Sequence, residues 1–132
     1  MRTIKIIIEK TADYYDAYAK NCEGIYGAGA TTDEAKQNVL EGLKLFVESR
    51  PKEALPKILQ GEYKVTYQYD VMSFLNYFNR FLTNVAMERL TGINQKLLHQ
   101  YSTGLTKPRA AQLKRIETAM HNFGNELLSV KL

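Results

Sequence analysis

The 132-residue sequence has few of the side chains that bind metals or form disulfides, with one Cys, two His and no Trp. A single cysteine, Cys22, excludes an intrachain disulfide and a multi-thiolate metal site. With only His99 and His121 besides, the sequence offers no credible set of zinc ligands. We therefore expect no metal and no cofactor, and we expect Cys22 to be a buried or half-buried small apolar residue.

The sequence also lacks a long apolar segment. Its longest apolar run covers residues 6–8, far short of the roughly 18 residues that a membrane-spanning helix requires. No charged leader precedes an apolar signal region. Because 45% of the residues are hydrophobic, the chain can bury a core as one ordinary domain or two very small ones. We expect a cytoplasmic protein without a membrane partner.

Charge is distributed unevenly along the chain. Residues 1–70 carry 10 Lys and Arg against 11 Asp and Glu, whereas residues 71–132 carry 8 against 3. The second half is therefore basic, and this asymmetry favours a polyanionic partner for it. A solvated basic face is the common alternative explanation.

The first half, residues 1–70, is dominated by strand patterns, since β-branched and aromatic residues alternate there between short turns. The turns are short enough for the first three strands to form an antiparallel meander. The expected strands are "TIKIIIE" at 3–9, "YYDAYAK" at 14–20, "IYGAGAT" at 25–31 and "YKVTYQY" at 63–69.

One helix interrupts these strands. Thr31 followed by Glu34 is a capping box, and apolar residues then recur at helical spacing as far as Arg50 and Pro51. A three-stranded sheet with an uncovered apolar face is marginal in water, so this helix should lie across it. The expected order is β-β-β-α-β.

The second half, residues 71–132, is expected to be all-helical, with the division near residues 70–73. Helices are expected over 73–82, 83–90, 94–104 and 108–128. Residues 128–132 alternate apolar and polar side chains, which is typical of a short strand. Such a strand would need a partner, for example a second copy of the chain. The fold class is therefore α+β.

Two of these helices are joined by a tight turn. Ala86 and Leu90 are expected on the inner face of the first, and Gly92 permits the turn. Asn94 caps the second helix, whose inner residues point back at the first. These inner residues are Leu97, Leu98 and Tyr101.

The outer face of the second helix then carries Gln95, Lys96, His99 and Gln100. Gln forms bidentate hydrogen bonds to adenine and Lys donates to guanine, so this face can contact base edges in the major groove of DNA. Gly104 closes the helix, and Pro108 suits the start of the next. Residues around that junction are expected near phosphates, namely Thr103, Thr106, Lys107 and Arg109. The alternative is a plain helical hairpin whose polar residues only face water.

Residues 74–127 resemble the Xre-like helix-turn-helix of the lambda-repressor class. By that match residues 83–90 form the first helix of the motif and 94–103 the recognition helix. Gln95, Lys96 and Gln100 then occupy the base-reading positions. The resemblance implies double-stranded operator DNA as a partner and a homodimer or higher homo-oligomer.

Residues 3–70 resemble the HicB-type antitoxin domain. The likeness rests on an aromatic-Ala-aromatic strand, two glycines and a Thr-x-Glu helix start. These are Tyr15, Ala17, Tyr18, Gly24, Gly29, Thr31, Asp33, Glu34 and Ala35. The resemblance implies a partial RNase H-like domain, residues 1–70, that blocks a small basic HicA-type mRNA-cleaving toxin. Residues 71–132 would then form the helix-turn-helix domain that represses the operon encoding both proteins.

The binding site for a basic toxin is predicted at an acidic patch of Glu9, Asp13, Asp16 and Glu23. The alternative for each of them is a solvated loop carboxylate without a partner. We expect no catalysis, because lysines interleave these carboxylates and no nucleophilic, Walker or dinucleotide motif is present. The alternative function is a free-standing transcriptional regulator whose first domain senses a ligand or dimerises. The neighbouring gene distinguishes the antitoxin from the regulator. A short reading frame for a basic protein favours the antitoxin, and its absence favours the regulator.

Overall fold

The computed structural model describes residues 1–132 and divides into two compact units, residues 1–73 and 74–132. We call them the sheet unit and the helical unit and describe each by itself. The division falls after Ser73, inside the first turn of helix α2 (Val71–Phe78). The expected α+β class is confirmed. None of the helices is both long and apolar enough to cross a membrane.

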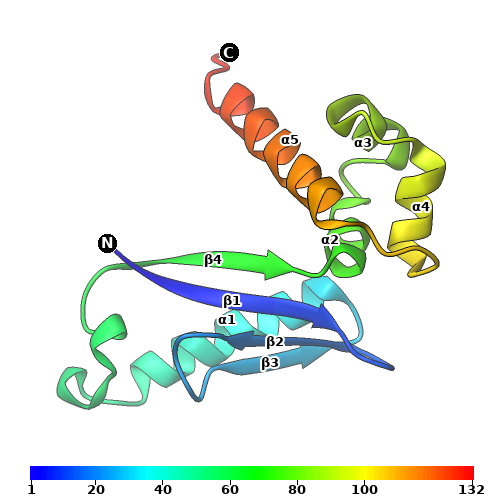
Figure 1. The fold of residues 1–132 in the computed structure, drawn as a ribbon. Helices are drawn as coiled ribbons and strands as arrows, with labels where there is room; N and C mark the ends of the chain where they lie inside the picture. Colours follow the sequence, from blue (N-terminus) through cyan, green and yellow to red (C-terminus); the bar gives the residue numbers. More distant parts are fainter. The chain divides into compact units, whose positions relative to one another are not determined.

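The sheet unit contains a four-stranded mixed sheet in the order β3-β2-β1-β4 (Figure 1). The strands are β1 (Arg2–Lys10), β2 (Tyr15–Ala19), β3 (Tyr26–Gly29) and β4 (Tyr63–Tyr69). The first three form the predicted antiparallel meander. β4 instead pairs in parallel with β1, because the chain returns to the sheet through α1 (Thr32–Glu48).

The core of the sheet unit lies between one face of the sheet and α1 (Figure 1). Alternate residues of β1, namely Ile4, Ile6 and Ile8, are fully buried on that face. From α1, Ala35, Val39 and Leu43 are buried at helical spacing. The helix begins as expected, since the Thr31 hydroxyl accepts a hydrogen bond from the Glu34 N–H at 3.1 Å.

Glycines in β3 allow α1 to approach the sheet closely. A Cβ on Gly27 would lie 2.3 Å from the backbone nitrogen of Val39. A Cβ on Gly29 would lie 2.7 Å from that of Ala35. The Asn38 amide also donates to the Ala28 carbonyl at 2.6 Å. The β3–α1 contact is therefore a backbone-to-backbone approach that only glycine permits.

The remaining segments of the sheet unit complete its core. Cys22 is buried as expected, and this burial raises the pKa of its thiol. After α1, two short 3-10 helices contribute the buried residues Leu55 and Leu59. They are η1 (Lys52–Ala54) and η2 (Lys57–Leu59).

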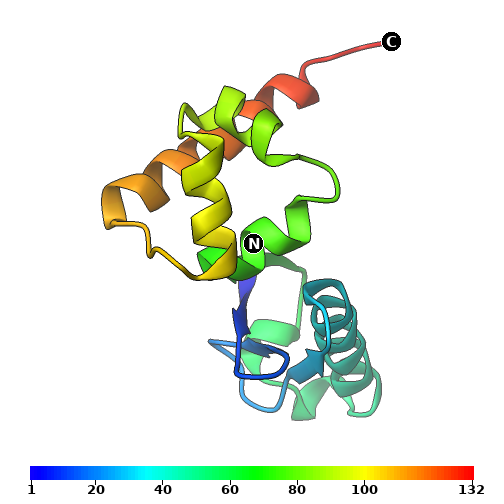
Figure 2. The ribbon, with the colours of Figure 1, turned by 90° about the vertical axis from the view of Figure 1, so that its right-hand side faces the viewer.

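The helical unit consists of the rest of α2 and three further helices (Figure 2). They are α3 (Asn84–Thr91), α4 (Gln95–Thr103) and α5 (Ala110–Leu128). α3 packs against both α4 and α5.

Two expectations for the helical unit are wrong. The last helix begins at Ala110 rather than at Pro108, because Arg109 keeps an extended backbone as its N-cap. The helix expected over residues 73–82 is α2, which begins at Val71 and ends at Phe78. The strand expected at residues 128–132 needs a partner that a single chain does not supply, so it stays a prediction.

Candidate nucleic-acid interface

The helices α3 and α4 are each capped at both ends, at Asn94, Gly92 and Gly104 as the sequence suggests and also at Thr83. The Thr83 hydroxyl accepts from the Ala86 N–H at 3.2 Å, and the Asn94 side chain accepts from the Lys96 N–H at 2.8 Å. Gly92 and Gly104 end the two helices at φ values of 74° and 82°. Because this left-handed region favours glycine, both helices stop where the sequence predicts.

Polar contacts across the turn couple the two helices. The Thr91 hydroxyl donates to the Met87 carbonyl at 2.7 Å and accepts from the Ile93 N–H at 3.1 Å. A carboxylate oxygen of Glu88 accepts from the Gln95 N–H at 2.9 Å. The negative charge of Glu88 therefore lies at the positive end of the α4 dipole. α4 is thus held to α3 by hydrogen bonds as well as by buried side chains.

The inner face of α3 differs from the expected one. Met87 and Thr91 are buried, whereas Ala86 and Leu90 are only half-buried. The buried stripe is rotated by one residue, because Thr91 satisfies its hydroxyl within the turn and can occupy a core position. The inner face of α4 agrees with the prediction, since Leu98 and Tyr101 are buried and Leu97 is half-buried.

The outer face of α4 presents three of the four side chains expected there. Gln95, Lys96 and His99 are exposed within its first two turns. Gln100 is different, because it is half-buried and its side-chain oxygen accepts from the Thr106 hydroxyl at 2.9 Å. The expectation that Gln100 stands free is therefore wrong. Its amide NH₂ is the group left to donate outward.

The junction after α4 carries the other predicted side chains. Thr103, Lys107 and Arg109 are exposed, and the Thr103 hydroxyl donates to the Gln100 carbonyl at 3.2 Å. Thr106 is half-buried and bonded to Gln100, so it fixes the junction rather than projecting from it. Lys107 and Arg109 thus remain the exposed cations there.

Two residues that sequence reasoning missed belong to this region. Glu88 caps α4 from outside the helix, and Arg115 of α5 lies against the turn, since a Cβ on Gly92 would come 2.6 Å from its guanidinium. A local signal exists for Glu88, because it is the only carboxylate of α3. No local signal exists for Arg115, which reaches the turn through tertiary packing alone.

In the sheet unit, the predicted acidic residues are only partly brought together. Glu9 and Asp16 face each other across β1 and β2, on the sheet face opposite α1. Asp13 lies in the turn at the same end of the hairpin, whereas Glu23 lies in the turn at the other end of β2. The expectation of a four-residue patch is therefore wrong for Glu23, because the length of β2 separates it from the others.

The Glu9–Asp16 pair places two carboxylates directly opposite one another, an arrangement that destabilises a sheet. Asp16 gains one neutral partner, because the Tyr26 hydroxyl donates to it at 2.8 Å. This hydrogen bond raises the pKa of Tyr26. Neither carboxylate forms an ion pair with a Lys or Arg of the chain.

Nowhere in the chain do three His, Cys, Asp or Glu side chains gather as metal ligands. Comparison with known proteins adds nothing to this geometry, since no family model, no curated protein and no solved structure matches the chain.

Proposed function

We propose that this protein is a HicB-type antitoxin of a type II toxin–antitoxin pair. In this proposal the helical unit is an Xre-like helix-turn-helix domain that binds operator DNA and represses its own operon. The sheet unit is a partial RNase H-like domain that neutralises a small basic HicA-type toxin. A cytoplasmic location follows from both roles.

The observation that carries the proposal is the outer face of α4. It presents an amide, an ammonium and an imidazole at Gln95, Lys96 and His99, while its opposite face is buried. The major groove is about 12 Å wide and admits one α-helix with its side chains. A helix capped at both ends and bonded to its neighbour presents these groups in a fixed register.

The exposed cations at the junction support a second part of DNA binding. Lys107 and Arg109 stand beside the C-terminal end of α4. Cations at such a position neutralise phosphates and release counterions, which supplies affinity independent of sequence. The net charge of +5 over residues 71–132 acts in the same direction.

One recognition helix reads only a few base pairs, so the proposal includes a homodimer or higher homo-oligomer. Two copies of α4 about 34 Å apart would read two half-sites separated by one helical turn of DNA. Linking the two binding events raises the affinity without new contacts.

A specific observation favours the antitoxin over a free-standing regulator. Glu9 and Asp16 repel one another on a sheet face that α1 does not cover. A basic protein bound there would relieve this repulsion, whereas dimerisation through the same face would bring four carboxylates together. Charge complementarity thus supports a small basic partner for the sheet unit.

The DNA-binding part is tested by selecting sequences from a random double-stranded pool with the full-length protein. We expect an inverted repeat to be enriched. Gln95→Ala should then relax preference at one position of each half-site, at about 1–3 kcal/mol for the best base. Lys107→Ala should weaken binding to every sequence and lower the salt slope by about one. No enrichment, or equal losses for both variants on all sequences, would refute this part.

The toxin-binding part is tested with the product of the adjacent gene, provided that gene encodes a small basic protein. We expect it to co-purify with the wild-type chain and to be lost from a Glu9→Gln, Asp16→Asn double variant. Glu23→Gln is the matched control, because it also removes one carboxylate but lies at the other end of β2. Equal retention by the double variant and the control would show that Glu9 and Asp16 do not form the binding site. Failure of the wild-type chain to retain the partner would favour the regulator instead.

A further inference from the structure

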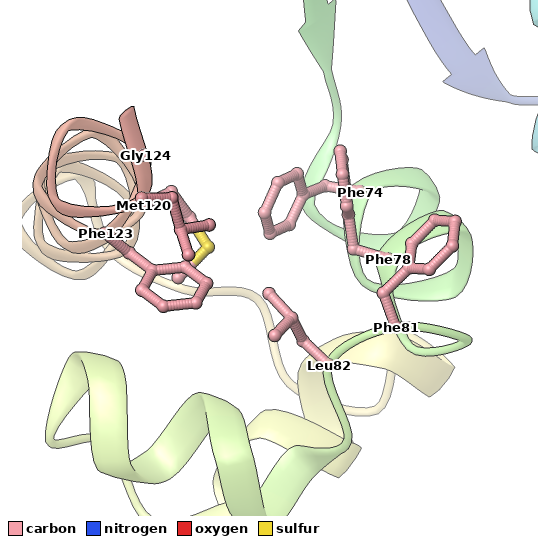
Figure 3. A pocket seen from close by; sticks show the side chains of 8 residues that line it. Phe74, Phe78, Phe81, Leu82, Met120, Phe123 and Gly124 are labelled. Atoms are coloured by element: carbon pink, nitrogen blue, oxygen red, sulfur yellow. The ribbon is translucent and has the colours of Figure 1, made fainter. Parts of the chain in front are cut away.

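The helical unit leaves an apolar groove open between two of its segments, as Figure 3 shows. Phe78, Phe81 and Leu82 line one side, from the end of α2 and the residues after it. Met120, Phe123 and Leu127 line the other side, from the second half of α5. We call this hollow of about 420 Å³ the α2–α5 groove.

The groove is not covered by the helical unit itself. Phe81 is 65% exposed and Leu127 is 55% exposed, although both are large apolar side chains. A contiguous apolar hollow of this kind is a feature of interaction sites rather than of ordinary surface. The groove therefore suits an occupant of apolar chemistry.

Gly124, which also lines the groove, indicates how close that occupant comes. It lies inside α5, where glycine weakens a helix relative to alanine. A Cβ at this position would meet nothing within 4 Å, and its φ is not positive, so nothing inside the chain requires a glycine. Glycine permits the close approach of another backbone, and the open space beside Gly124 leaves room for one.

A segment of matching chemistry stands beside the groove on the same helix. The C-terminal tail, residues 128–132, begins at the last residue of α5 and has three exposed apolar residues, Leu128, Val130 and Leu132. After α5 ends, the chain extends away from the helix (Figure 2). Drawn out as a strand, these alternate residues lie on one side of the tail. In the single chain this apolar side covers nothing.

We propose that the tail of a second copy occupies the α2–α5 groove, with its backbone passing over Gly124. The same chain supplies both the apolar tail and the apolar groove. A two-fold axis then satisfies both at once, because each copy gives its tail and receives the other's. The alternation that predicted a strand at residues 128–132 is thereby assigned a place to dock.

The proposal is tested by sedimentation of the full chain, without DNA, over a micromolar concentration range. We expect the wild type to dimerise. The triple variant Leu128→Ser, Val130→Ser, Leu132→Ser should raise the dissociation constant at least about tenfold. Leu105→Ser is the matched control, since Leu105 is 76% exposed outside the groove, and it should leave association unchanged. A monomeric wild type, or a triple variant that dimerises normally, would overturn the proposal.

Substitution at Gly124 tests the other half of the contact. Gly124→Ala should strengthen α5 and raise the melting temperature of the isolated chain at low concentration, because its Cβ has room. The same change should weaken dimerisation, and Gly124→Leu should weaken it further by filling the groove. Both variants are expected to fold, so unchanged association in both would contradict the proposal.

Mixing distinguishes exchange between copies from a tail folded into its own groove. The triple tail variant keeps an intact groove, and Gly124→Leu keeps an intact tail. In an equimolar mixture, the intact tail of the Gly124→Leu chain can bind the intact groove of the tail variant. The mixture should therefore associate more strongly than either variant alone. Absence of this rescue would overturn exchange between copies, and none of these outcomes depends on DNA binding.

Discussion

The sheet unit and the helical unit bury their apolar residues to very different degrees. Thirteen buried hydrophobic residues form one core cluster in the sheet unit. The helical unit has six, Leu75, Met87, Ile93, Leu98, Tyr101 and Ile116. Large exposed hydrophobic residues show the opposite distribution, because the helical unit has eight of the twelve in the chain.

This difference teaches how each unit is held together. The sheet unit is stabilised by burial and by the close β3–α1 approach at Gly27. The helical unit relies more on caps and on hydrogen bonds across its turn, such as those of Thr91 and Glu88. Its surplus of exposed apolar surface is what a unit with binding partners would carry.

The largest expected effect tests the close approach in the sheet unit. Gly27→Ala places a Cβ 2.3 Å from a backbone atom of α1, which no side-chain rotation relieves. We expect the free energy of unfolding to fall by about 3 kcal/mol or more in urea titration. Gly61→Ala, whose Cβ meets nothing within 4 Å, is the control and should change it by less than about 0.5 kcal/mol. Similar values for the two variants would contradict the importance of this contact.

Leu98→Ala is the corresponding core substitution in the helical unit. Leu98 is fully buried on the inner face of α4, so the cavity left by the substitution should lower the free energy of unfolding by about 3 kcal/mol. Hydrogen exchange should show protection lost over residues 74–132 and kept over the strands of the sheet unit. Loss of protection in both units together would show that they unfold as one unit and are not stabilised separately. Leu105→Ala, at an exposed site, should leave the exchange pattern unchanged.

A smaller effect is expected at the Gln100–Thr106 hydrogen bond. Thr106→Val keeps the side-chain shape but removes the hydroxyl, which should lower the free energy of unfolding by about 1 kcal/mol. It should also free the Gln100 amide and alter base preference at its position in a selected DNA site. If stability falls while base preference stays the same, Gln100 does not contact a base.

The smallest expected effect is a titration in the sheet unit. The hydrogen bond to Asp16 raises the pKa of Tyr26, so its stabilising effect is complete below the ordinary tyrosine pKa and is lost as the pH rises through the raised value. In an absorbance titration, Asp16→Ala should move one of the nine tyrosines to lower pH. Asp13→Ala, in the neighbouring turn, should leave the pKa of Tyr26 unchanged.

Much of the fold could be predicted because its signals are local. Strand alternation, the Thr31 cap and the glycines at 92 and 104 each act within a few residues, and the structure has the corresponding elements. The four-residue acidic patch failed because sequence proximity ignored the direction of β2, which carries Glu23 away from Asp16.

The candidate interface was predictable for the same reason and only to the same extent. Gln95, Lys96 and His99 are exposed because helical spacing alone puts them opposite Leu98 and Tyr101. The hydrogen bond of Gln100 was not predicted because its partner, Thr106, lies beyond the turn at Gly104. Helical spacing within α4 gives no information about the path of the chain after that turn.

The sequence by itself determined the order and approximate position of most helices and strands, the helix caps at Thr31 and Asn94, and which half of the chain is basic. Periodicity, capping and charge are properties of neighbouring residues, so they need no knowledge of the fold. Only the tertiary structure decided that Glu9 faces Asp16, that Glu88 caps α4, and that a groove opens beside Gly124. These features join residues of different elements, and packing alone fixes the distance between them.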